Sequence, residues 1–105
     1  MTATDNPGEI SRIKINLETS KIAWKELQRF FAGGKALVAS ADLDLVEVAY
    51  QMSEDNVEQI QQWAMAGKLV RVPDEQAREW FEADALVWAV VVKPWVLVQP
   101  VGLLH

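Results

Sequence analysis

The 105-residue sequence contains no cysteine, and its only histidine is the last residue, His105. The absence of cysteine excludes disulfides, thiolate zinc sites, iron–sulfur ligation and cysteine nucleophiles. A histidine at a chain end is not held in place, so we do not expect it to transfer protons or bind a metal. We therefore predict a protein without a cofactor, a metal site or catalytic residues.

Long apolar runs are also absent. No segment reaches the roughly 18 apolar residues that a membrane-spanning helix needs, and the first seventeen residues lack the apolar core of a secretory signal. We expect a cytoplasmic protein that does not bind a membrane.

Positive charge is scarce in the middle of the chain. The net charge is −5, and no Lys or Arg lies between Ala36 and Gly67, a segment that contains six acidic residues. Because nucleic-acid binding depends on cations that neutralise phosphates, this distribution argues against a nucleic-acid partner.

Half of the residues are hydrophobic, and the length suits one domain with a single core. Residues 1–9, which include Pro7 and Gly8, predict a flexible tail. Residues 10–105 are predicted to form a single α+β domain.

Helical periodicity occurs in four segments. The first runs from about Ile10 to Gly33, with Asn16 as a candidate N-cap and Gly33-Gly34 as a stop. The second, 42–52, has Asp42 as its candidate cap and can also be interpreted as a strand. A third helix is predicted from Ser53 to Gly67, and a fourth from Pro73 to Asp84.

The β-rich segments are 35–39, 68–72 and 86–99. In the last one Trp88, Val90 and Val92 lie on one face, and the alternation continues across Pro94 through Val96 and Val98. Because proline cannot donate to a sheet ladder, this segment is either an edge strand or bends at Lys93-Pro94 into two strands.

These elements predict an α+β fold in which three to four helices pack on one face of a small sheet. The other face of 86–99 would then need cover from a second copy of the chain, and we predict a homo-oligomer, a dimer, with an adaptor, regulatory or binding role. The alternative is that another helix of the same chain covers that face. The predicted contacts with a partner protein or a small-molecule ligand are Val91, Lys93, Pro94, Trp95 and Leu97.

Tryptophan is abundant, with five residues at 24, 63, 80, 88 and 95. They could line an aromatic ligand cage, but three fall on the core faces of predicted helices, and packing is the simpler interpretation.

An acidic surface cluster, Asp42, Asp44 and Glu47, is the nearest approach to a metal or catalytic site. Its spacing lacks the glycine and the final glutamate of a calcium loop, and acids are favoured at helix starts. An enzyme that combines one of these carboxylates with Lys93 is an alternative that would require a cleft joining them.

The order of elements also resembles a winged-helix module, a second alternative that would make the protein a transcriptional regulator. The helix that would read DNA carries Glu54, Asp55 and Glu58 and no basic residue, which argues against base or phosphate contacts.

Three blocks, "ETSKIAWKELQRFFAGGK", "LDLVEVAYQMSEDN" and "WAVVVKPWVLVQP", resemble the small bacterial family known as domain of unknown function 2288. The resemblance runs from about Glu18 to Pro100. It implies a stand-alone single-domain protein and supplies no activity, cofactor or catalytic residue.

Overall fold

The structure is a computed structural model that describes residues 7–101. His105 and residues 1–6 of the predicted tail lie outside the described residues. Within 7–101 the chain forms five α-helices, one 3-10 helix and five strands. In chain order they are α1 (Pro7–Glu18), β1 (Ser20–Ala23), η2 (Trp24–Leu27), α2 (Gln28–Ala32), β2 (Ala36–Ala39), α3 (Leu45–Ser53), α4 (Val57–Met65), β3 (Leu69–Arg71), α5 (Asp74–Glu82), β4 (Leu86–Val92) and β5 (Trp95–Pro100).

The five strands form one mixed sheet in the order β1-β4-β5-β2-β3. β4 and β5 pair antiparallel across the centre, from Val92 opposite Trp95 to Val87 opposite Pro100. β5 pairs parallel with β2, and β1 and β3 are the antiparallel edges. The α+β class predicted from the sequence is confirmed.

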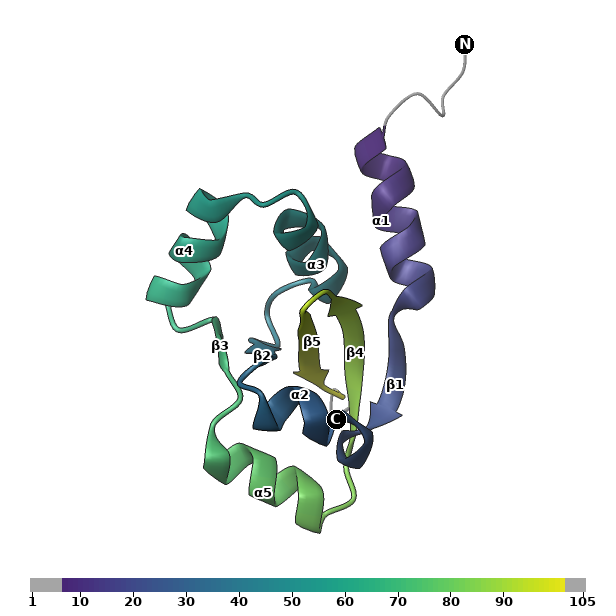
Figure 1. Ribbon diagram of the computed structural model, residues 1–105. Coiled ribbons are helices and arrows are strands. Elements are labelled where there is room, and N and C mark those ends of the chain that lie inside the picture. Colours follow the sequence, from purple (N-terminus) through teal and green to yellow (C-terminus); the bar gives the residue numbers. More distant parts are fainter. Residues whose placement is uncertain (1–6, 102–105) are drawn as a thin grey trace.

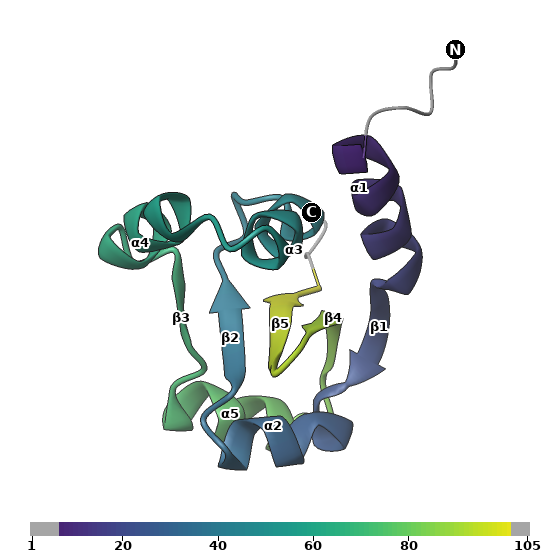
Figure 2. The same ribbon diagram turned by 45° about the horizontal axis from the view of Figure 1, so that its top comes forward.

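Helices cover both faces of the sheet, as Figure 2 shows with α3 and α4 on one side and α2 and α5 on the other. One core cluster joins η2, α2 and α5 to the sheet around Trp24, Trp80 and Val96. The second joins α1, α3 and α4 to the opposite face around Val48 and Leu97. The prediction that helices pack on one face only is therefore wrong, and the alternative, cover from the same chain, is what the structure has.

This two-sided cover follows from the composition of the central strands. In β4 and β5 both faces are apolar except for Gln99, which donates to the carbonyls of Ser40 and Leu43, so each face needs a helical layer. The uncovered face from which we predicted a dimer does not exist, and the oligomeric state stays a prediction without that support.

The segment 86–99 is two strands joined by a tight turn at Lys93 and Pro94, where the peptide bond is cis. This outcome corrects the predicted faces. Val96 and Val98 do not continue the face of Val90 but lie with Ala89 in the other core cluster, because the chain reverses at the turn. Pro94 does not interrupt the ladder, since it lies in the turn.

The helix predicted from about Ile10 to Gly33 is interrupted by strand β1. Ser20–Ala23 pairs with β4. Lys21 lies over the ring of Trp88 on one face of the sheet, and Ile22 packs against the cluster of Trp24 on the other face. Four residues are too few to separate a period of two from a helical period, so pairing with β4 decides the conformation. Asn16 is consequently inside α1, which already begins at Pro7 (Figure 1).

Four helices end with the same pair of backbone hydrogen bonds, the Schellman arrangement, around a residue of positive φ. That residue is Gly34 after α2, Asp55 after α3, Gly67 after α4 and Asp84 after α5. The two glycines were recognised as helix ends from the sequence. Asp55 falls inside the third predicted helix, because Asp adopts this conformation less readily than Gly and gives a weaker signal. Asp84 is the last residue of the fourth predicted helix, two residues beyond the end of α5.

The caps of α3 and α4 also differ from the predictions. The Asp44 side chain, and not Asp42, accepts from the first-turn amides of α3, and α3 extends through Ser53, the predicted cap of the next helix. Asn56 caps α4 instead and accepts from the amide of Gln59.

Segment 86–99, the last strand in the winged-helix alternative, forms the β4–β5 hairpin in the middle of this sheet, with helical layers on both sides. Within residues 7–101, no helix combines the length and apolar character that crossing a bilayer requires.

Replacement of Leu97 by Ala is expected to lower the free energy of unfolding by about 2–5 kcal/mol, because a fully buried leucine leaves a cavity. Val91→Ala, at a side chain of the neighbouring strand that is 48% exposed, serves as the matched control and should have a much smaller effect. Urea denaturation of both variants measures the difference, and equal losses would contradict the assignment of Leu97 to the core.

Candidate functional site

The three acidic residues of the predicted surface cluster have separate structural partners. Asp44 caps α3, Glu47 pairs with Arg12 from α1, and Asp42 pairs with Lys68. Among the described residues, no group of three His, Cys, Asp or Glu side chains is placed to hold a metal ion. The cluster is therefore a set of contacts around the start of α3, which join it to α1 and to Lys68.

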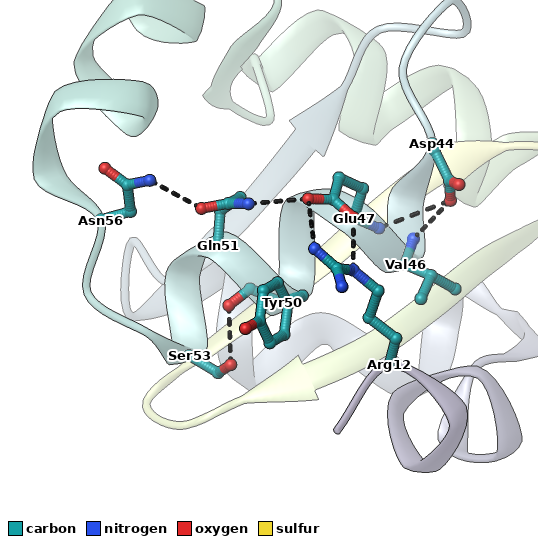
Figure 3. A network of polar contacts seen from close by, with 8 residues as sticks. All are labelled: Arg12, Asp44, Val46, Glu47, Tyr50, Gln51, Ser53 and Asn56. Atoms are coloured by element: carbon teal, nitrogen blue, oxygen red, sulfur yellow. Dashed lines mark hydrogen bonds and ion pairs between the residues drawn. The ribbon is translucent and has the colours of Figure 1, made fainter. Parts of the chain in front are cut away.

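Glu47 is the centre of a polar network between α1 and α3 (Figure 3). Arg12 donates from Nε to Glu47 Oε1 at 2.8 Å, and the guanidinium carbon lies 4.1 Å from the centre of the Tyr50 ring. Gln51 donates to the same carboxylate at 2.7 Å and accepts from Asn56, the cap of α4. The hydrogen bond from Arg12 holds the pKa of Glu47 below its usual range. The network thus connects α1, α3 and α4 in one line of hydrogen bonds.

Asp42 lies at the end of β2, where it accepts from Ser40 and from Lys68 Nζ at 2.7 Å. These hydrogen bonds, that of Lys68 first, lower the pKa of Asp42 from 3.8 to about 2. Lys93 lies beyond the opposite end of β5, because Gln99, near the other end of that strand, donates to the carbonyl of Ser40. The structure therefore does not bring Lys93 together with Asp42, one of the three carboxylates that the carboxylate–lysine alternative considered as its partner.

Titration of Asp42 tests this contact. Lys68→Met is expected to raise the pKa of Asp42 from about 2 toward 3.8, because the largest lowering contact is removed. The ion pair stabilises the fold fully above the unfolded pKa, and its contribution is lost as the pH falls through the folded pKa, between about 4 and 2. Carboxyl chemical shifts measured against pH give the midpoint, and an unchanged midpoint in the variant would contradict the contact.

The five predicted contact residues divide between the core, the surface and a groove. Leu97 is fully buried, so its assignment as a contact residue is wrong: helices of the same chain cover its face. Val91 is half-exposed on the other face of the sheet, toward the cluster of Trp24. Pro94 is exposed in the turn, whereas Lys93 and Trp95 line the groove.

The groove has a volume of about 550 Å³ and lies between α4 and the sheet. Its floor comes from β2, β3 and the tip of the β4–β5 hairpin, and its wall from α4 and the corner between α3 and α4. The lining residues are Leu37, Met52, Asp55, Val57, Ile60, Gln61, Ala64, Leu69, Val70, Arg71, Val92, Lys93 and Trp95. Most of them are apolar.

The groove exists because α4 covers the sheet incompletely. Ile60 reaches the core beside α3, but Val57, at the start of the helix, is 54% exposed. Trp95, opposite Val92 in the hairpin, is only partly buried. Apolar surface therefore remains open at the end of the sheet where β5 begins.

Three cations lie at this end of the sheet. Arg71 and Lys93 line the groove, and Lys35 Nζ lies 4.8 Å from the centre of the Trp95 ring. A Cβ built on Gly34 would lie 3.9 Å from Nη1 of Arg71, so the guanidinium extends toward the start of β2. None of the three cations forms an ion pair with a described carboxylate.

The other tryptophans serve packing. Trp24 is fully buried with edge contacts to Phe31 and Trp80, at ring distances of 5.7 and 5.1 Å, and Trp63 and Trp88 pack against the second core cluster. A cage that joins all five side chains is not present among the described residues, because they divide between the two faces.

The sequence drew attention to Trp95 and Lys93 but missed most of the groove. Arg71 lies in the segment predicted as a strand, 68–72, and Ala64 in the helix predicted from Ser53 to Gly67, without a site role for either. Val57 lies in the same predicted helix, and its 54% exposure comes from the packing of α4 and not from the sequence pattern.

Three comparisons with known proteins bear on this fold. The model of the family described as "Protein of unknown function (DUF2288)" matches residues 10–100. The solved structure described as "NMR solution structure of PA1075 from Pseudomonas Aeruginosa" is 39% identical, with a TM-score of 0.76, covering 100% of this chain and 97% of that one. No curated protein matches the chain. The expected family is thereby confirmed.

Proposed function

For this chain, which belongs to the family described as "Protein of unknown function (DUF2288)", we propose a binding function: the groove beside α4 holds an apolar ligand without catalysis. The observation that supports the proposal is the open apolar surface between α4 and the sheet. Its volume of about 550 Å³ lies in the range of about 300–1,000 Å³ that small-ligand sites have.

The lining suits binding better than chemistry. Its only carboxylate belongs to Asp55, which stands at the corner between α3 and α4, and the cations come from β3 and the hairpin tip. The wall also gives a regulatory role a structural basis. α4 meets α3 at Asp55 and at the hydrogen bond of 2.7 Å between Gln51 and Asn56. A ligand that contacts Ile60 and Ala64 would therefore act on the position of α4 relative to α3.

Substitution of Ala64 by Trp tests the site, because an indole at this position on the groove wall would fill the space. Binding of the uncharged fluorescent probe phenylnaphthylamine is expected to weaken by about tenfold or more, since the probe and the indole compete for the same apolar surface. Fluorescence titration of the probe measures the affinity.

Ala66→Trp is the matched control, because Ala66 is an exposed alanine at the end of the same helix but outside the groove lining. It should bind the probe as the unchanged protein does. Equal affinity in both variants, with circular dichroism showing that both are folded, would refute binding in the groove.

A further inference from the structure

We propose that the groove selects an apolar small molecule that carries one anionic group, with the anion at the end of the groove formed by Arg71, Lys93 and Lys35. This inference rests on the proposed function and adds the charge of the ligand.

Three cations from three different elements lie at one end of the groove. Arg71 comes from β3, Lys93 from the turn between β4 and β5, and Lys35 from the residue before β2. The parallel pairing of β2 with β5 brings them together, because Ala36 lies opposite Val96 and both strands begin at this end. The juxtaposition is therefore a property of the sheet and not of one flexible loop.

The cations have no anion of their own among the described side chains. The ion pairs that the structure contains join Arg12 to Glu47, Lys25 to Asp84 and Lys68 to Asp42, away from the groove. Asp55 is the acidic side chain in the lining, so the groove with Lys35 holds three positive charges against one negative charge. The chain as a whole is acidic, with a net charge of −5, which makes this local excess of positive charge distinctive.

Trp95 connects the charged end to the apolar floor. Its ring lines the groove, and Lys35 Nζ stands 4.8 Å from the ring centre. A cation over the indole face is attracted to the ring and is held near it. An apolar ligand on the floor would thus contact Trp95 and Leu37 while its anionic group reaches the guanidinium of Arg71, which can donate two parallel hydrogen bonds to a carboxylate, phosphate or sulfonate.

A pair of matched probes tests the charge. Anilinonaphthalene sulfonate and phenylnaphthylamine share the same aromatic framework and differ in the anionic group. We expect the sulfonate to bind the unchanged protein more tightly, at one molecule per chain, and added salt to weaken its binding but not that of the uncharged probe. The double variant Arg71→Gln, Lys93→Gln should lose roughly three- to tenfold in sulfonate affinity, the range for two exposed charge pairs, with little change for the uncharged probe.

The matched control is Arg29→Gln, Arg78→Gln, which removes the same charge from α2 and α5 on the other side of the sheet. If it weakens sulfonate binding as much as the groove variant does, general charge and not the groove explains the preference, and the inference fails.

Failure of the inference can be distinguished from failure of the proposed function. One outcome is that Ala64→Trp weakens the binding of both probes, while the unchanged protein binds the two equally well and the substitutions of Arg71 and Lys93 change neither affinity. The groove would then be a binding site without charge selection. If Ala64→Trp affects neither probe, the groove is not the site and both proposals are overturned.

Discussion

The β4–β5 hairpin is the constraint on which the rest of the fold depends. Its two strands occupy the centre of the sheet, and both faces carry fully buried side chains. These are Val87, Val96 and Val98 on one face and Leu97 on the other. Burial of one such side chain stabilises the fold by about 1.5–3 kcal/mol, so neither face can be left in water. Every helix of the structure belongs to one of the two layers that these faces demand, including α1, whose Ile15 packs with the second cluster.

The groove is a consequence of the same arrangement. The sheet needs cover out to β3, its edge, but the helix on that side, α4, is only nine residues long and reaches the core mainly through Ile60 and Trp63. The hairpin tip at Val92 and Trp95 extends past this cover. A strongly apolar hairpin with a short helix beside it therefore leaves one open apolar surface, and the site is located where the two layers fit least closely.

The sequence predicts the element types well where a single period is sustained. The helices around Val48, Ile60 and Trp80 and the strands at β2 and β3 are found close to the predicted ranges. It fails where a tertiary contact decides, since β1 exists through its pairing with β4. It also misses the end of α3 at Asp55, where no glycine signals an end. The sequence indicates that both faces of 86–99 are apolar. It does not indicate which helices cover them, because that depends on the topology, so two-sided cover is only the alternative prediction.

The candidate site shows a similar division. Trp95 and Lys93 were identified because they stand out within an apolar segment. Leu97, two residues after Trp95 on the same face, is core because helices cover that part of the strand. Arg71 could not be identified, because its proximity to Lys35 arises from strand order. Net charge also misleads at this scale. At physiological salt the field of a charge falls off over about 8 Å, so the three cations at this end of the sheet act on a nearby ligand more strongly than distant acids do. The acidic middle of the chain argues against a nucleic-acid partner, but it does not fix the charge of what the groove can hold.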